Sequence, residues 1–367
     1  MSQKKRHLIF SDFVNAWSIR HGLRQLGKHV EYVPNSLEST RSNHARLHSG
    51  DVLFFTDERG LQQFADRSEL RFLPRPGTLV IDDKLWFYDW LAARGEQTIP
   101  YGARLESLDI WPVLIKARHS WKDHRKLPRG FVCSNPLEFR QSQQQIHSMG
   151  LNESDFCTQK FITSPGFVYS VCGHFDSHDN QQNAILVTRK TMTSVETLGT
   201  GTVVDTVDDP ADLLARTTGI LNALEYCGPF ELEFLHDTDT QTYYVLELNP
   251  RFWMQHGIFI ERFDNILLKR YLGIDAPAGR HTQPIEPVCW MNRVDLLTSL
   301  VKCDWRVASR FISLWWQRRR QGIPCLLYPD LWTACGFLMR ICRQKFRFRT
   351  PPMPAATPDD RDVAAAA

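Results

Sequence analysis

One stretch of the chain, residues 228–251, restricts the fold more than any other because it has the pattern of a β-hairpin. In GPFELEFLHDTDTQTYYVLELNPR, large apolar residues at 230, 232 and 234 alternate with glutamates, as in a strand with one buried face. A segment rich in Asp and Thr follows, which is typical of a turn. On the second strand, alternation is expected to place five residues on one face: Tyr243, Val245, Glu247, Asn249 and Arg251.

The hairpin also predicts a metal site. If the turn centres on Thr240, Glu233 lies directly opposite Glu247, and Asn249 lies next to them. Two carboxylates that face each other across a ladder repel, unless a cation lies between them. Mg²⁺ takes a few carboxylate or amide oxygens from protein and completes its shell with phosphate and water. The alternative is a solvated strand face that carries acids, but Arg251, a fork for phosphate or carboxylate oxygens, favours the metal site.

The N-terminal third has the pattern of a parallel α/β sheet. HLIFSD (residues 7–12) is typical of a buried strand, and a helix is expected over residues 14–27. Further strands are expected in HVEYVP, in DVLFFTDERG and in GTLVIDD (residues 77–83). Strands that alternate with helices indicate a parallel sheet. No G-x-G-x-x-G opens the first helix, so a dinucleotide fold has no direct support.

The hairpin resembles the metal-binding core of the ATP-grasp superfamily, in which an acidic or amide residue on one strand is followed by E-x-N-P-R on the next. The longer form LNPRFWMQHG resembles ATP-grasp carboligases related to D-aspartate ligase and to the ATP-binding domain of the carbamoyl-phosphate synthase large chain. The resemblance implies that Glu233, Glu247 and Asn249 hold Mg²⁺ (or Mn²⁺) against the phosphates of ATP. It implies that Arg251 contacts the transferred phosphoryl group or the acyl phosphate.

Two lysines match further motifs of the superfamily. Lys84 follows an Asp and opens an expected helix with Leu85 and Tyr88 on one side, and the matching D-K dipeptide implies contact with ATP phosphate. Alone, it would be read as a surface lysine. The strand WPVLIKAR (residues 111–118) resembles the P-V-x-x-K strand, which implies that Lys116 lies on the α- and β-phosphates. Cations suit that role because phosphates gather negative charge during phosphoryl transfer.

Adenine recognition is expected at FCTQKFI (residues 156–162), which resembles the interdomain hinge of the superfamily. Gln159 and the backbone near Phe161 and Ile162 match, whereas Lys160 and Val168 stand where relatives often carry acids. The preceding loop, HSWKDHRKLPRG, is basic and poor in glycine, so its side chains are expected to cover the phosphates unless it is an ordinary solvated loop.

Later segments supply weaker candidates. Of the neighbours Arg189 and Lys190, only one can point inward from a strand, and Arg189 is favoured for phosphate or substrate carboxylate. His256 is a candidate for substrate contact, although core packing is the simpler interpretation. An amphipathic helix is expected over residues 210–226, and another in NILLKRYLG, ending at Gly273.

The charge of the chain is uneven. Its net charge is +3, yet residues 301–349 carry eleven Lys or Arg and only two Asp. This stretch has helical spacing with Trp and Phe among the basic residues, and three interpretations remain open. It packs against the rest of the chain, lies on an anionic membrane surface or binds an acidic partner. No nucleic-acid-binding motif accompanies the charge, so no nucleic-acid partner is expected.

Cysteine usage and hydropathy indicate a cytoplasmic protein, with peripheral membrane contact through residues 301–349 as the alternative. Nine Cys occur without a C-x-x-C pair or a His cluster at zinc spacing, which is typical of reduced thiols. No run of 18 apolar residues exists, and MSQKKRHLIF lacks the features of a signal peptide.

The sequence therefore predicts an α/β protein of the ATP-grasp type in four parts. These are a small Rossmann-like domain (1–95), a two-subdomain ATP-grasp domain (96–275), a helical basic and aromatic region (276–350) and a disordered tail (351–367). The resemblance implies an ATP- and Mg²⁺-dependent carboxylate–amine ligase that works through an acyl phosphate on small-molecule substrates. The alternatives are a nucleotide-binding regulatory protein without catalysis and a membrane-peripheral ligase with a lipid-linked substrate.

Overall fold

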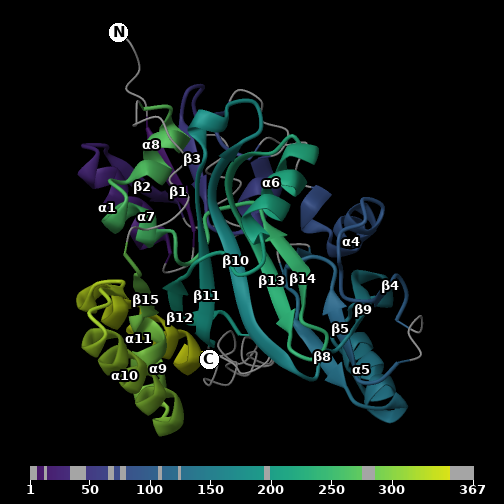
Figure 1. Ribbon diagram of the computed structural model, residues 1–367. Helices are drawn as coiled ribbons and strands as arrows, with labels where there is room; N and C mark the ends of the chain where they lie inside the picture. The colour runs from purple at the N-terminus through teal and green to yellow at the C-terminus, as the bar shows by residue number, and fades with distance from the viewer. Residues whose placement is uncertain are drawn as a thin grey trace, which may run out of the picture.

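The fold is built on two large sheets and one small parallel sheet, seen in Figure 1. The structure, a computed structural model, describes residues 6–11, 15–33, 47–64, 70–74, 80–105, 110–122, 125–193, 199–274 and 286–347. Helices and strands are mixed throughout this part of the chain, so the α/β prediction is confirmed.

The N-terminal part forms a parallel sheet of order β2-β1-β3. Its elements are β1 (His7–Phe10), α1 (Ala16–Gln25), β2 (Val30–Val33), β3 (Val52–Phe55) and α3 (Glu58–Phe64). Ile9 and Phe54 face one hydrophobic cluster, whereas Phe10 and Phe55 face another. Both faces of β1 and β3 are therefore covered, as is usual for parallel strands.

The middle part forms a four-stranded antiparallel sheet of order β4-β9-β5-β8 with its own core. Its elements are β4 (Tyr101–Gly102), β5 (Val113–Ala117), β8 (Gly130–Cys133), α5 (Pro136–Ser148), the short helix η2 (Glu153–Asp155) and β9 (Phe156–Lys160). Asn135 caps α5 through its side-chain oxygen, ahead of Pro136 in the first turn, which is a strong helix start. A two-stranded ribbon, β6 (Trp121–Lys122) and β7 (Arg125–Lys126), lies between β5 and β8 in the chain.

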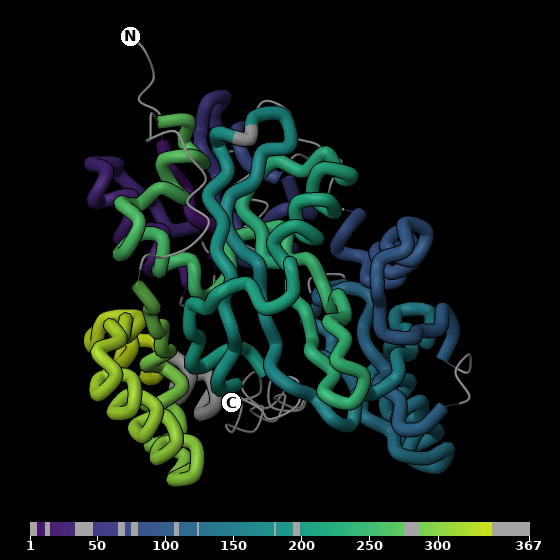
Figure 2. The backbone as a smooth tube through the Cα atoms, in the orientation of Figure 1, coloured from purple at the N-terminus to yellow at the C-terminus, as the bar shows by residue number. Residues whose placement is uncertain are grey.

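A seven-stranded sheet of order β14-β13-β10-β11-β12-β15-β16 forms the centre of the molecule (Figure 2). All pairs are antiparallel except β15 with β16. The strands are β10 (Pro165–Asp176), β11 (Ala184–Thr193), β12 (Gly201–Thr206), β13 (Cys227–Asp237), β14 (Thr242–Asn249), β15 (Cys289–Asn292) and β16 (Cys325–Tyr328).

Helices cover both faces of this sheet. On one face, α4 (Lys84–Ala92) and α6 (Leu213–Ala223) share a core with Phe230, Leu232 and Phe234. On the other face, α7 (Gly257–Arg262) and α8 (Ile266–Leu272) share a core with the N-terminal sheet. A short helix, η3 (Asn180–Gln182), joins β10 to β11.

The C-terminal region contains α9 (Arg293–Val301), α10 (Trp305–Arg320) and α11 (Leu331–Arg347). It also contributes β15 and β16 to the central sheet, which the sequence did not predict. Arg318 anchors α10 to this sheet, since its Nε and Nη2 donate to Asp205 on β12 at 2.8 and 2.7 Å. Within the described residues, no helix is long and apolar enough to cross a bilayer.

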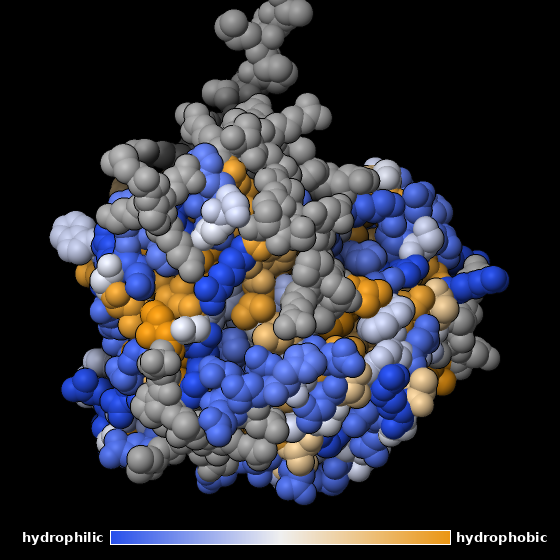
Figure 3. Space-filling view, turned by 90° about the horizontal axis from the view of Figure 1, so that it is seen from above, coloured by the Kyte–Doolittle hydropathy of each residue, from blue (hydrophilic) through white to orange (hydrophobic). Residues whose placement is uncertain are grey.

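One strand that the sequence predicts does not form, and the predicted domain boundaries are not tested by the structure. The strand expected in residues 77–83 is wrong for its described part, because Val80–Asp82 form a single 3₁₀ turn before α4. The domain boundaries stay predictions, and the one at 275/276 lies outside the described residues, as does the tail 351–367. From above, hydrophobic patches cross the middle of the surface from one side to the other, and the lower part of the view is mainly hydrophilic (Figure 3).

Candidate active site

The acidic side chains of the β13–β14 hairpin lie together as the sequence predicts. Glu233 is directly opposite Glu247, and Glu231 is directly opposite Asn249. Asn249 Nδ2 donates to Glu231 Oε2 at 3.2 Å, and Ser170 Oγ on β10 donates to Glu231 Oε1 at 3.2 Å. The result is a cluster of carboxylate and amide oxygens on one face of the central sheet.

A bulge in β14 corrects the expected arrangement of the second strand. The register shifts by one residue between Glu233 and Phe234, so Val245 pairs with Phe234 rather than lying on the face of Glu247. Val245 is buried in the core with Phe234, and Tyr243 packs on the same side. A bulge adds one residue and so reverses the alternation beyond it. The extra residue is Leu246, whose carbonyl accepts from Tyr88 Oη at 2.8 Å.

Three lysines from three elements face these acids. Lys190 on β11 places Nζ 2.6 Å from Glu233 Oε1. Lys116 on β5 and Lys84 at the start of α4 place Nζ 3.7 and 3.9 Å from Glu247 Oε2. Lys84 is positioned by the cap of α4, where Asp83 accepts from the N–H of Leu85. The structure thus brings together Lys84, Lys116, Glu233, Glu247 and Asn249.

The charges divide the acids into two kinds. Burial alone would raise the pKa of Glu247, but the positive charges of Lys116 and Lys84 outweigh it and lower the pKa to about 2. Burial and the negative charge of Glu233 raise the pKa of Glu231 to about 7, although Lys190 opposes them. Glu247 is therefore an anion at neutral pH, whereas Glu231 binds a proton readily.

Arg251 is held by an acid that sequence reasoning missed. Its Nε donates to Glu58 Oε1 at 2.6 Å, and its Nη2 donates to Asn249 Oδ1 at 3.2 Å. Burial would lower the pKa of Arg251, but Glu58 raises it above the usual arginine value. Glu58 starts α3 three residues after β3. An acid just past the carboxyl end of a parallel strand, where sites commonly form, is the signal that could have identified it.

The prediction that Arg189, rather than Lys190, points inward from β11 is wrong, because Lys190 is the side chain that points towards the acids. Arg189 lies 3.8 Å from Asp205, with its guanidinium over the ring of Phe167, whereas Lys190 is buried against Glu233. Adjacent residues of a strand point to opposite faces. The structure assigns the acidic face to Lys190.

The expected adenine-binding residues lie where the four-stranded sheet meets the central sheet. Gln159 is buried on β9, and its Nε2 has no hydrogen-bond partner within the described residues. The N–H of Phe161 donates to Pro112 O at 3.0 Å, so it is already used. The Ile162 N–H makes no hydrogen bond within the described part of the chain, which leaves it for a ligand.

The basic loop is partly engaged elsewhere. Lys122 binds Asp155 at 2.6 Å, and Arg125 donates to the carbonyl of Met149 at 2.6 Å. Arg129 instead donates to Thr200 Oγ1 at 3.1 Å, beside the segment that contains Gly199 and Gly201. Lys122 and Arg125, two of the basic side chains expected to cover the phosphates, therefore bind the four-stranded lobe itself.

His256 does not lie where it could contact a substrate. It is fully buried and packs edge-on against Phe252 and Trp253. Its Nδ1 donates to the carbonyl of Trp253. Core packing is therefore its role in this structure.

The predicted metal ligands suit Mg²⁺ in kind. Within the described ranges, no three His, Cys, Asp or Glu side chains converge as in a protein-only metal centre. Glu233 and Glu247 supply two facing carboxylates, and Asn249 supplies an amide oxygen beside them. Mg²⁺ needs few protein ligands of this type because phosphate and water complete its shell. The donor set therefore fits the ion.

Comparison with known proteins gives matches in structure only. No protein-family model and no curated protein sequence matches the chain. N5-carboxyaminoimidazole synthetase from Staphylococcus aureus, complexed with ADP, is 16% identical with a TM-score of 0.60, covering 81% of this chain and 84% of that one. Biotin carboxylase from Campylobacter jejuni, in a β,γ-ATP complex, is 16% identical with a TM-score of 0.59, covering 77% and 74%.

A third solved structure carries a second ligand. N5-carboxyaminoimidazole synthase from Aspergillus clavatus, in complex with ADP and 5-aminoimidazole ribonucleotide, is 12% identical with a TM-score of 0.57, covering 78% of this chain and 81% of that one. At these identities the likeness concerns the fold. The resemblance to D-aspartate ligase stays a prediction.

Proposed function

Because the chain has the ATP-grasp fold, we propose that it is an ATP- and Mg²⁺-dependent ligase that joins a carboxylate to an amine through an acyl phosphate. One observation carries the proposal. Lys84 and Lys116 come from different elements, yet both lie within 4 Å of Glu247, which itself faces Glu233. Carboxylates that lie among fixed cations could hold a Mg²⁺ ion while the cations bind phosphate oxygens.

In this proposal, two lysines of the site bind the phosphates, and two acids and Asn249 bind the metal ion. Lys84 and Lys116 bind phosphate oxygens of ATP and offset the charge that gathers on ADP as it leaves. Glu233, Glu247 and Asn249 would hold Mg²⁺, which would supply positive charge beside the phosphates. Glu247 suits this role because its low pKa keeps it ionised. Lys190 holds Glu233 in place, and Arg189, which was expected to contact phosphate or substrate carboxylate, has no part in the proposal.

The reaction has two steps. A substrate carboxylate oxygen attacks the γ-phosphorus, the bond from that phosphorus to the bridging oxygen breaks, and ADP leaves. Arg251 stabilises the transferred phosphoryl group, and Glu58 and Asn249 hold its guanidinium in one orientation. The amine nitrogen then attacks the acyl carbon, inorganic phosphate leaves, and the amine loses a proton. Fixed charges of this kind act without reorganisation at the moment of reaction.

Adenine is placed in the proposal at the junction of β9 and β10. The Ile162 N–H and Gln159 Nε2, which have no hydrogen-bond partner in the part of the chain that the structure describes, are the donors that support this placement. Both can donate to ring nitrogens of the base. Phe161 contributes its side chain rather than its N–H, since that N–H binds Pro112.

The first test is ADP release with Mg²⁺ and ATP, while carboxylates and amines are screened singly and in pairs. We expect turnover only when both substrates are present. Glu247→Gln should reduce kcat at least a hundredfold without changing the melting temperature by more than a few degrees. Glu96→Gln is the matched control, because Glu96 pairs with Arg216 outside the cluster. Full activity of Glu247→Gln would contradict the assigned role. ATP binding without turnover for any pair would support the regulatory alternative.

A second proposal concerns where the enzyme works, and it rests on the exposed face of α10. Trp305, Ile312 and Trp316 are 65%, 43% and 55% exposed. At 100° per residue they form one stripe on the solvent side of the helix. The exposed Arg306, Arg310 and Arg320 lie along its flank. Exposed Trp beside Arg is typical of helices that lie in the surface of anionic membranes. We propose that α10 binds such a surface peripherally.

Vesicle cosedimentation tests this contact. The chain should bind vesicles that contain phosphatidylglycerol and should bind pure phosphatidylcholine weakly. The double variant Trp305→Ser, Trp316→Ser should lower binding about tenfold, since the two exposed rings that would enter the membrane surface are lost. Trp111→Ser, which removes a half-exposed ring on the four-stranded lobe, is the control. Equal binding by the double variant and the wild type would rule the contact out.

A further inference from the structure

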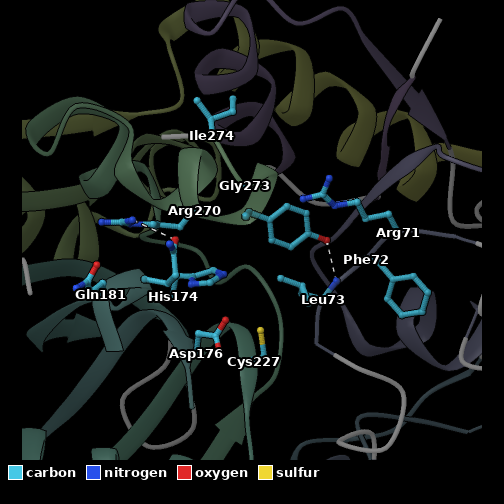
Figure 4. Close-up of a pocket in the computed structure, with 12 residues that line it drawn as sticks. Arg71, Phe72, Leu73, His174, Asp176, Gln181, Cys227, Arg270, Gly273 and Ile274 are labelled. Carbon is cyan, nitrogen blue, oxygen red and sulfur yellow. Dashed lines mark hydrogen bonds between the residues drawn. The ribbon is translucent and has the colours of Figure 1, made fainter. Parts of the chain in front are cut away.

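A cavity lies away from the acidic cluster, at the junction of the N-terminal part, the central sheet and α8. Its volume is about 480 Å³. Figure 4 shows Arg270 and His174 on one side and Arg71 and Leu73 on the other. Asp176, Gln181 and Gln182 add further polar groups to the lining. Cavities of this volume commonly hold small organic molecules.

Two arginines give the cavity positive charge. Arg270, at the end of α8, is buried, and its Nη1 donates to Gln182 Oε1 at 3.1 Å. Arg71, on the opposite wall, donates from Nη2 to the carbonyl of Leu272 at 2.9 Å. Each guanidinium carries five N–H donors in a fixed, planar fork. A planar oxyanion such as a carboxylate matches two such forks.

His174 gives independent evidence for a ligand. It is 2% exposed and lines the cavity from β10. Neither ring nitrogen forms a hydrogen bond of normal geometry within the described residues, although the Gln182 backbone acts on the ring. Burial and the charge of Arg270 lower the pKa of His174 to about 4, so the ring is neutral at pH 7. A neutral imidazole has one donor and one acceptor, and buried polar atoms nearly always have partners.

The remaining lining limits the kind of ligand. Phe72, Leu73, Tyr271 and Ile274 form apolar walls around the polar groups, so the cavity has room for a carbon skeleton as well as a charged group. Asp176 adds a negative acceptor. It favours a ligand that carries a donor, such as an amino or hydroxyl group, beside its carboxylate.

We propose that this cavity is a separate binding site for a small amino or hydroxy carboxylic acid. Arg71 and Arg270 bind the carboxylate, His174 completes its hydrogen bonds, and Asp176 accepts from the amino or hydroxyl group. The site is distinct from the acidic cluster. His174 is four residues along β10 from Ser170, which contacts Glu231, and four strand residues span about 13 Å.

Isothermal titration of the full chain, without nucleotide, tests the site. The probes are glutamate, aspartate, lactate, malate, succinate and inorganic phosphate, each titrated alone. We expect at least one amino or hydroxy acid to bind. Arg270→Gln and Arg71→Gln should each weaken it about tenfold or more, which is the typical loss for one charged hydrogen-bonding partner. Lys269→Gln is the matched control: it removes a charge from the same helix, but its Nζ pairs with the exposed Asp264.

Further variants separate this site from the proposed active site and from misfolding. Gln181→Trp changes an exposed residue of the lining, so it should block binding while the melting temperature stays unchanged. Arg251→Gln should leave binding unchanged. The proposal is overturned if no amino or hydroxy acid binds, or if Arg251→Gln abolishes binding while Arg270→Gln preserves it. Equal loss in Lys269→Gln and Arg270→Gln would overturn it as well. None of these readouts depends on turnover.

Discussion

Glu247 keeps its negative charge although another carboxylate faces it across the ladder. The reason is that Lys116 and Lys84 approach it from outside the hairpin, while Lys190 neutralises Glu233. Each acid of the facing pair thus has its own cation. Buried groups of this kind are costly unless every charge is matched. The pair can therefore exist before any metal ion binds, with its charges already balanced by protein.

This balance predicts the effect of removing Lys190. Lys190→Met leaves Glu231 and Glu233 buried together without their cation. The free energy of unfolding should fall by about 3–5 kcal/mol, the usual cost of breaking a buried pair from one side. If the acids bind Mg²⁺, saturating MgCl₂ without nucleotide should recover more stability in this variant than in the wild type. Urea denaturation with and without the salt measures both effects.

Lys269→Met is the control for that experiment. Its Nζ pairs with Asp264 on the surface, so its loss should cost less than about 1 kcal/mol. An equal response to MgCl₂ in the wild type and Lys190→Met would show that these acids do not take the ion.

At the scale of single residues, the sequence identified the site residues that belong to a recognisable motif and missed those that do not. Glu247, Asn249, Lys84 and Lys116 lie together as expected. Arg189 and Lys190 could not be distinguished, because alternation says that they diverge but not which one faces inward. Glu58 belongs to another sheet and meets Arg251 only through the tertiary fold.

At the scale of elements, the β14 bulge determines which side chains reach the site. Alternation alone placed Tyr243 and Val245 with Glu247, whereas the shift at Leu246 returns them to the core. The alternation does break here, since residues 243–246 (YYVL) are apolar or aromatic without interruption, but one strand read alone does not show which of them is the extra residue. The freed Leu246 carbonyl binds Tyr88 of α4, so the irregularity joins the hairpin to the helix that begins at Lys84.

Helices with clear ends were easier to predict than short strands. The helix expected after Asp83 occurs as α4, and the helix expected to end at Gly273 does so with that glycine at φ 64°, a conformation that glycine favours. By contrast, β15 and β16 have four residues each. Four residues are too few to show a period, and only pairing with β12 and with each other defines these strands.

At the scale of the whole molecule, buried histidine links stability to pH. Burial lowers the pKa of His256 to about 4, although the hydrogen bond from its Nδ1 to the Trp253 carbonyl opposes the shift. Below about pH 6.5 the unfolded chain takes up a proton that the folded chain does not. His256 therefore favours the folded state less as pH falls from about 6.5 to about 4.

The variant His256→Gln isolates this contribution. It should be less stable than the wild type at neutral pH, and the difference should shrink by up to about 1.4 kcal/mol per pH unit between pH 6.5 and 4. Urea titrations across that range measure it. Gln255→Ala, a buried and non-titrating neighbour, should show a constant difference. A constant difference for His256→Gln would mean that the buried ring accepts a proton freely.

The order of the N-terminal sheet, the four-stranded lobe and the central sheet along the chain was predictable from the sequence, but the packing of these parts against one another was not. The alternation of strands and helices, followed by a lysine strand, a hinge and an acidic hairpin, indicated the arrangement in chain order. Which parts share a core depends on contacts between distant residues. Ile9 and Phe54 pack with Phe252, Tyr271 and Trp290 in a single cluster, and no local pattern predicts this.

That shared core has a consequence for motion. The N-terminal sheet and the central sheet are fused, since Tyr271 Oη also donates to Leu53 O and accepts from the N–H of Leu73. The four-stranded lobe instead has a core that contains only its own residues, from Leu105 to Phe156. A body with a separate core can rotate at its connections without breaking that core. We therefore expect the four-stranded lobe to rotate as one body against the fused N-terminal and central sheets. Lys116 moves with the lobe, while Glu247 and Arg251 stay with the central sheet. Rotation of the lobe away from the central sheet therefore separates Lys116 from Glu247, the acid that it faces.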